Sequence, residues 1–143
     1  MALKIYDPDE VTIVMGPVLI TSGLADGEFV RVEQESDAFS DVVGTDGEVA
    51  RSKTNDRRAT ITFMLMQTSD FNDQLSALSA LDKSTSDGAG VVPLFIRDRQ
   101  GRAIYAAENA WIQKDPDVSF DREATAREWT IRTDNLVRHD GGN

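Results

Sequence analysis

The sequence FVRVEQES (Phe29–Ser36) opens the stretch that decides the fold of this chain. This strand-like run leads into DAFSDVVGTDGEVARSKTNDR, a polar and turn-rich segment over residues 37–57. A second strand-like run, RATITFMLMQ (Arg58–Gln67), follows, and then the helix-like TSDFNDQLSALSALDK (Thr68–Lys83). We therefore predict two long strands joined by a long hairpin loop, and then one helix at about residues 69–83. A connection of this length inside a compact domain is usually either functional or disordered.

The long loop over residues 37–57 carries apolar side chains in a polar setting. They are Phe39, Val42, Val43 and Val49, and they alternate with turn-favouring Gly, Asp and Asn residues. Two hypotheses remain open: these side chains fold back on their own domain, or they insert into a partner molecule. The basic residues Arg51 and Lys53 favour docking onto an acidic surface of another copy of the chain.

The two strands that flank the loop have faces of different character. In Arg58–Gln67, one face is apolar and is predicted to be core; it carries Ala59, Ile61, Phe63 and Leu65. The opposite face changes from threonine to methionine, with Thr60, Thr62, Met64 and Met66. In Phe29–Ser36, Val30 and Val32 lie opposite a face that includes Arg31, Glu33 and Glu35. We therefore expect the earlier strand to be half exposed.

The segment after the second strand has helical periodicity. Ser69 is a plausible N-cap, and Asp70 falls in the first turn, where the helix dipole favours negative charge. Apolar residues then recur at spacings of four, three and three, which predicts one stripe that faces the core. The residues of this stripe are Phe71, Leu75, Leu78 and Leu81.

The rest of the chain is typical of strands and turns. Short strands at Val11–Met15 and Val18–Thr21 surround Gly16-Pro17. A strand at Val91–Asp98 carries Pro93, which predicts an edge strand or a bulge. Further strands are predicted at Arg102–Ile112 and Ala126–Val137. About six to eight strands and one helix favour a mainly β, α+β fold, an antiparallel β-sandwich or partial barrel with a packed helix. The 143 residues fit a single domain over 1–143.

Composition argues against several classes of function. The chain has no cysteine, which excludes disulfides and thiolate chemistry, and its net charge of −10 argues against nucleic-acid binding as the main role. His139 is the only histidine and lies near the C-terminus. The GxSxG, HExxH and P-loop patterns do not occur. Both tryptophans fall on strands predicted to be core. We expect no enzyme, no cofactor, no metal site and no membrane span.

The order of elements from TIVMGPVLITSGLADGEF through DFNDQLSALSALD resembles the tail tube proteins of contractile-tailed bacteriophages. The resemblance implies a β-sandwich or partial barrel, flanked by a helix, that completes a β-barrel when copies assemble. It implies hexameric rings that stack into the inner tail tube, through which genomic DNA passes. In this family the long loop contacts the adjacent ring. Residues Phe39, Val42, Val43, Val49, Arg51 and Lys53 then become candidates for ring stacking.

The same resemblance suggests a lumen and a set of partners. Strands with one polar face would line an acidic lumen that repels phosphate, and the candidates are Glu33, Glu35, Thr60 and Thr62. The chain itself is the main partner, together with a sheath protein, a baseplate and a tail terminator. We expect the protein in the virion tail, and in the host cytoplasm before assembly. Three alternatives stay open: the tube of a related contractile injection system, a ring-forming tail terminator or connector, and a small β-barrel ligand-binding module.

Overall fold

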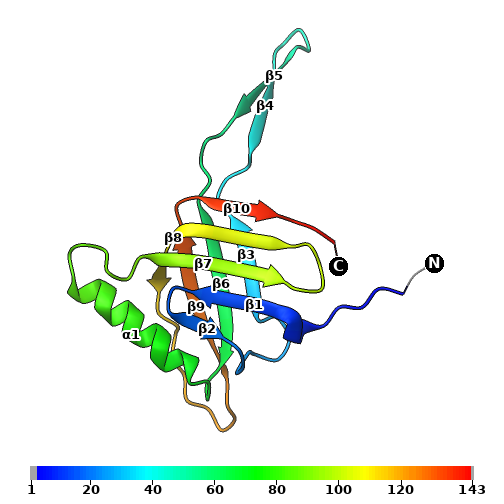
Figure 1. Ribbon diagram of the computed structural model, residues 1–143. Helices are drawn as coiled ribbons and strands as arrows, with labels where there is room; N and C mark the ends of the chain where they lie inside the picture. Colours follow the sequence, from blue (N-terminus) through cyan, green and yellow to red (C-terminus); the bar gives the residue numbers. More distant parts are fainter. Residues whose placement is uncertain (1–2, 143) are drawn as a thin grey trace.

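The computed structural model describes residues 3–142 and shows a mainly β protein with one α-helix (Figure 1). A short 3-10 helix, η1, covers Pro8–Glu10. The strands and the helix follow in this order: β1 (Val11–Met15), β2 (Val18–Ile20), β3 (Val30–Gln34), β4 (Phe39–Val43), β5 (Val49–Lys53), β6 (Ala59–Met66), α1 (Phe71–Ser84), β7 (Val92–Asp98), β8 (Ile104–Lys114), β9 (Ala126–Thr133) and β10 (Leu136–His139).

One antiparallel sheet of eight strands forms the body, in the order β2-β1-β7-β8-β9-β6-β3 with β10 also beside β8. β9 and β10 lie along the same side of β8, because Thr133 pairs with Ala110 and Leu136 pairs with Ala107 in one register. The residues predicted as one strand, Ala126–Val137, therefore run along one side of β8 in a single register. The chain bends at Asp134-Asn135, so the structure divides this stretch into two strands.

The sheet folds over itself, so that β3, β6 and β9 cross the direction of β1, β7 and β8 (Figure 1). This is the orthogonal arrangement of packed sheets. The predicted core face of β6 is confirmed, since Ala59, Ile61, Phe63 and Leu65 are at most 1% exposed. They pack with Ile13, Leu94 and Ile131 from the other strands. The predicted fold class is confirmed, and the sheet of this single chain does not close into a barrel.

Pro93 causes a bulge and does not mark an edge. β7 lies between β1 and β8, and its register with β8 shifts between Val92 and Leu94. The carbonyl of Pro93 accepts the N–H of Gly16 at 2.8 Å, which extends the contact with the β1–β2 turn. Gly16 has φ +57°, and a Cβ there would lie 2.7 Å from the Val92 Cβ. A glycine is therefore required at this close approach.

Helix α1 covers part of the core with a stripe that differs from the predicted one. The helix begins at Phe71 with Asp70 as its N-cap, one residue after the predicted Ser69, and the Ser69 hydroxyl accepts the N–H of Phe71 at 3.2 Å. Leu75 and Leu78 are buried, and Phe71 packs against the core. Leu81, however, is 46% exposed, so its place in the core stripe is wrong. At 3.6 residues per turn it lies about 120° around the helix from Leu75.

The segment over residues 37–57 forms a second, two-stranded sheet of its own. β4 and β5 pair from Phe39↔Lys53 to Val43↔Val49 and stand away from the body (Figure 1). Each of their residues is exposed. The hypothesis that the apolar side chains of this loop fold back on their own domain is therefore wrong.

Candidate self-assembly interface

The tip of the β4–β5 hairpin is a tight and well-specified turn. Gly47 donates to the Gly44 carbonyl at 3.0 Å, and Gly44 donates to the Glu48 carbonyl at 2.8 Å. Gly47 has φ +89°, the conformation that this type of three-residue hairpin loop requires after its type I turn. The Asp46 side chain accepts the N–H of Glu48 at 3.1 Å. The tip therefore has a defined shape although it is surrounded by solvent.

The register of the hairpin divides the predicted stacking residues between two faces. Cross-strand partners share a face, and faces alternate along each strand. One face carries Phe39 with Lys53, Asp41 with Arg51, and Val43 with Val49. The opposite face carries Val42 with Ala50 and Ser40 with Ser52. Val42, Val43 and Val49 are 62–66% exposed, and Phe39 is 46% exposed. The Arg51 guanidinium lies 4.2 Å from the centre of the Phe39 ring.

Asp56 ties the root of the hairpin to the body. Its carboxylate accepts the Ser36 hydroxyl at 2.7 Å and two guanidinium N–H groups of Arg58 at 2.9 Å each. Those Arg58 bonds, followed by the bond from Ser36, hold the pKa of Asp56 well below its usual range. Two backbone bonds add to this clamp: Thr54 to Ala38 at 2.9 Å and Glu35 to Arg58 at 3.1 Å. The direction in which the hairpin leaves the body is therefore fixed by polar contacts.

The predicted lumen residues share one outward face of β3 and β6. Glu33 pairs with Thr60, and Arg31 pairs with Thr62. The Glu35 carboxylate accepts the Thr60 hydroxyl. Thr62 lies on this face but is only 6% exposed, because its neighbours cover it. Glu33, Glu35 and Thr60 remain at or near the surface, so the face is polar, as predicted for one side of these strands.

Two arginines, which sequence reasoning did not select, organise this polar face. Arg31 contacts the carboxylates of Glu28, Glu33 and Glu128 at 3.1–3.6 Å. Arg132, from β9, contacts Glu35 at 3.3 Å. Alternation in Phe29–Ser36 could have identified Arg31 from the sequence. The meeting of Arg132 with Glu35 depends on the pairing of β6 with both β3 and β9, which local periodicity does not specify.

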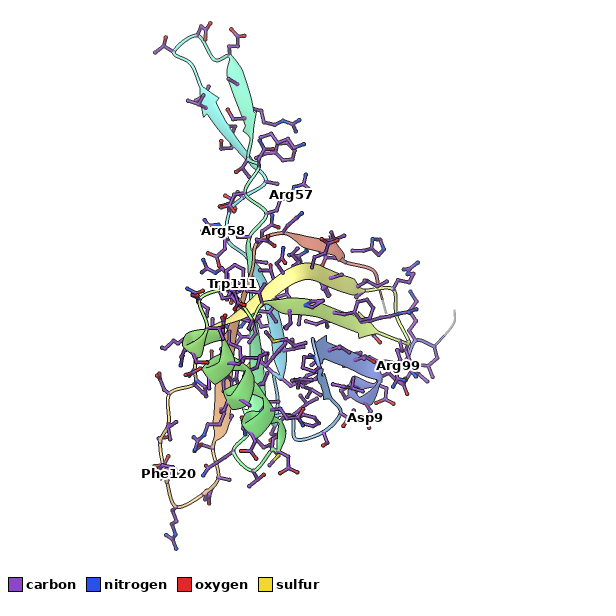
Figure 2. The ribbon with its side chains drawn as sticks, turned by 60° about the vertical axis from the view of Figure 1, so that its left-hand side comes forward. Asp9, Arg57, Arg58, Arg99, Trp111 and Phe120 are labelled. Carbon is purple, nitrogen blue, oxygen red and sulfur yellow. The ribbon has the colours of Figure 1, made fainter. Side chains whose placement is uncertain are left out.

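Trp111 also lies on this outward face, which corrects the expectation that both tryptophans are core. Trp129 is 2% exposed, as predicted. Trp111 instead pairs with Arg132, is half-buried, and donates its indole N–H to Gln113 at 2.7 Å (Figure 2).

Over residues 3–142, no group of three or more His, Asp or Glu side chains could hold a metal ion. The described part of the chain also contains no helix long and apolar enough to cross a membrane.

Within residues 3–142 the outer sides of β2, β3 and β10 and the end of β8 beyond β7 have no paired strand, and β3 and the end of β8 are the two of these edges that border the polar face. β3 ends the sheet, so the side of Val30–Gln34 that faces away from β6 has no strand beside it in the described chain. β8 runs past the start of β7, whose first pair is Val92 with Ala110. The stretch Trp111–Lys114 therefore pairs with β9 on one side only, again within residues 3–142. These two edges flank the four-strand unit β3-β6-β9-β8, which carries the polar face.

The fold, the exposed hairpin and the open edges agree with the comparison to known proteins. The family model of the bacteriophage PhiTE tail tube protein matches residues 11–138. The chain belongs to this family of phage tail tube proteins. A structural protein of Pseudomonas phage KPP10, ORF10, is 32% identical over 143 residues, which cover 96% of this chain and 83% of that protein. The chain is thus a structural component of a virion tail and not an enzyme.

Solved structures with similar folds come from contractile injection systems. The tube-terminating cap of the anti-feeding prophage aligns with a TM-score of 0.60 at 9% identity, over 97% of this chain and 93% of the cap. The sheath/tube terminator of an extracellular contractile injection system aligns at 0.59 and 9%, over 97% and 99%. A chain of the sheath–tube complex of that system aligns at 0.56 and 10%, over 94% and 90%. At these identities the likeness concerns the fold alone.

Proposed function

We propose that this protein builds the inner tube of a contractile phage tail. Copies close into hexameric rings, and rings stack into a hollow tube that conducts genomic DNA. The single observation that carries the proposal is the β4–β5 hairpin, which stands away from the body with every strand residue exposed. A two-stranded ribbon is at best marginally stable in water. A chain that places Val43 and Val49 at the end of such a ribbon needs a neighbour to cover them.

Ring closure follows from the open edges of the body. An unpaired edge strand invites uncontrolled association, and closure into a barrel removes it. We propose that the free side of β3 pairs with the free side of β8, at Trp111–Lys114, of the next copy. The four strands β3, β6, β9 and β8 of each copy then become one segment of a continuous inner barrel. This pairing leaves the polar face, with Glu33, Glu35 and Thr60, on the inside.

The charge of that face suits the passage of DNA. Four glutamates lie on or beside it against two arginines that neutralise part of their charge: Glu28, Glu33, Glu35 and Glu128 with Arg31 and Arg132. The net charge of the whole chain is −10. An acidic lining repels phosphates, so DNA would pass without tight contacts. Thr62 would stay beneath this lining and contact no DNA in our proposal.

A tail tube has partners besides itself. The similar chains come from complexes described as sheath–tube and sheath/tube terminator, which supports a sheath protein around the tube. We further propose a baseplate at which the tube begins, a terminator at which it ends, and assembly in the host cytoplasm. DNA conduction, as opposed to delivery of another cargo, rests on the membership of a phage family.

Removal of the hairpin tests the proposal. Residues 39–55 are replaced by a short Gly-Ser turn, which leaves the root bond between Ser36 and Asp56 in place. We expect the protein to fold, because the hairpin contributes nothing to the buried core. We also expect it to form no tubes, because the proposed stacking contact is removed. Circular dichroism measures folding, and negative-stain microscopy of concentrated protein measures assembly. The unmodified chain is the control and should give rings or tubes; tubes of normal length from the deleted form would contradict the role of the hairpin.

A tail terminator is the second candidate function. The alignments to the cap and the terminator have TM-scores of 0.60 and 0.59, against 0.56 for the sheath–tube complex. A terminator also forms a ring but stops growth. Assembly length separates the two: extended tubes from the purified protein support the tube, and single rings under all conditions support the terminator.

A further inference from the structure

A second protruding segment lies at the end of the molecule opposite the hairpin. The loop over residues 115–125 connects β8 to β9 and hangs below the body, with Phe120 at its outer side (Figures 1 and 2). Phe120 is 81% exposed and Val118 is 61% exposed. The chain thus presents apolar side chains at two opposite poles, the hairpin and this loop.

Polar contacts fix this loop to the body at both of its ends and at one residue between them. At its start, Asp115 accepts the Ser79 hydroxyl at 2.7 Å and the Lys83 ammonium at 2.5 Å, both from α1. At its end, Thr125 exchanges backbone and side-chain bonds with Gln67 at 3.0–3.1 Å. The buried Arg127 bonds the Ser119 carbonyl at 3.3 Å between these points. The exposed ring is therefore displayed by an ordered backbone, which lowers the entropy cost of binding.

Arg127 also contacts the aromatic ring itself. Its guanidinium lies 5.5 Å from the centre of the Phe120 ring, and the side chain is 8% exposed. One buried arginine thus supports both the backbone at Ser119 and the ring at Phe120. The Phe120 ring nevertheless remains 81% exposed.

We propose that the loop over residues 115–125 receives the β4–β5 hairpin of a second copy of the chain. The proposal rests on the proposed function, because it names the two surfaces that meet when rings stack. The hairpin of the same molecule lies at the opposite pole and does not reach this loop (Figure 1). A contact between two different surfaces of identical copies is heterologous and propagates as a filament. Growth of this kind requires the two contact surfaces to lie at opposite ends of the molecule, as the hairpin and the loop do.

The chemistry of the two surfaces is complementary. The hairpin face with Val43 and Val49 also carries two basic residues, Arg51 and Lys53, against one acidic residue, Asp41. Next to Val118 and Phe120 in the sequence are Asp117, Asp121 and Glu123; Asp117 also contacts Lys114 at 3.7 Å, and residues 115–125 contain one basic residue, Arg122. Apolar contact supplies attraction, and opposite charges set the register. With five residues in β4, the hairpin strands extend about 17 Å at 3.3 Å per residue, which is long enough to lie along the loop.

The absence of cysteine from the chain permits a direct test by disulfide cross-linking. Two proteins are prepared, one with Val43→Cys and one with Val118→Cys; both positions are exposed, so folding is retained. After mixing, assembly and oxidation, we expect covalent dimers that contain one copy of each. A protein with both substitutions should give a ladder of covalent oligomers on denaturing gels. The control pairs Val43→Cys with Leu81→Cys, an exposed position on α1 (46%, against 61% for Val118).

The proposal predicts at least about tenfold more mixed dimer from the first pair than from the control pair, since docked residues react at a high effective concentration. Equal yields from the two pairs, together with tubes seen by microscopy, would overturn the contact and leave the proposed function intact. An absence of rings and tubes from the cysteine-free protein would overturn the proposed function and the contact together.

Discussion

At the scale of single residues, polar side-chain contacts orient the two protruding segments, the β4–β5 hairpin and the loop over residues 115–125. Asp56 holds the hairpin root through Ser36 and Arg58, and Asp115 holds the opposite loop through Ser79 and Lys83. Bonds to the charged forms of these carboxylates lower both pKa values, with Arg58 as the largest cause for Asp56 and Lys83 for Asp115. Neither residue contributes to the apolar core. Their role is to orient elements whose partners are outside the chain.

The Asp56 clamp should be insensitive to pH in the neutral range and fail only in acid. Its pKa in the folded chain is below the ordinary value of 3.8, so its contribution to stability is present above that value. The contribution is lost as the pH falls through the lower, folded pKa. We expect amide hydrogen exchange at Thr54 and Glu35 to stay slow from pH 7 to pH 4, after correction for intrinsic rates. A loosening of these amides already between pH 7 and pH 5 would contradict the assignment.

An Asp56→Asn variant provides the control for this titration. The amide side chain cannot reproduce two charge-assisted bonds to Arg58, so the root should exchange faster at every pH. The core strands should keep wild-type protection, because Asp56 lies outside the buried cluster.

At the scale of elements, burial distinguishes parts that fold the chain from parts that join copies. α1 and β6 each bury some of their apolar side chains within the molecule, whereas β4 and β5 bury none of theirs. The helix shows the distinction within one element. Its inner side carries Leu75 and Leu78, and Ser79 beside them is buried because its hydroxyl bonds Asp115. Leu81 faces away from this side.

Matched leucine substitutions test which side of α1 supports the fold. Leu75→Ala should lower the free energy of unfolding by about 2–5 kcal/mol, because it leaves a cavity under a fully buried side chain. Leu81→Ala should change it by about 0.5 kcal/mol or less, as for an exposed position. Urea denaturation monitored by circular dichroism measures both. Similar losses for the two variants would mean that the helix packs on the stripe predicted from its spacing.

At the scale of the whole molecule, the chain is an open sheet with two poles. The open edges that border its polar face are β3 and the end of β8, and its poles are the hairpin and the loop over residues 115–125. The first pair of surfaces serves ring closure in our proposal, and the second serves stacking. The polar face between the edges has a defined charge, which makes the proposed lumen testable without a structure of the tube.

Charge reversal on the polar face should convert a tube that repels DNA into one that retains it. We expect Glu33→Lys tubes to bind double-stranded DNA at low salt and to release it as salt increases, with a slope near 0.9 per phosphate contacted. Glu33 is on the proposed lumen face and its side chain is 57% exposed. Filter binding across a salt series measures this affinity.

The control for the charge reversal is Asp87→Lys, in the exposed loop after α1. It changes the net charge by the same amount at a site away from the polar face. Equal DNA retention by both variants would show that net charge, and not the lumen, is responsible.

Local patterns in the sequence determined the elements and their faces. The alternation in Arg58–Gln67 predicts the buried face of β6, and the run over 37–57 predicts a long excursion between two strands. Both follow from the two-residue period of a strand and from turn-forming residues. Membership of the tail tube family was also visible at this level, through the order of the elements.

Only the tertiary structure decided which surfaces stay uncovered. The sequence left open whether Pro93 marks an edge or a bulge, placed Leu81 in the core stripe and Trp111 among core positions, and did not distinguish a packed loop from a free hairpin. Each of these outcomes depends on which distant strand lies beside the residue. Trp111, for example, lies where β8 extends beyond the first paired residue of β7. Periodicity is a property of neighbouring residues, whereas exposure depends on contacts between residues far apart in the chain. The proposed assembly surfaces are the strand edges and exposed side chains that those contacts do not cover.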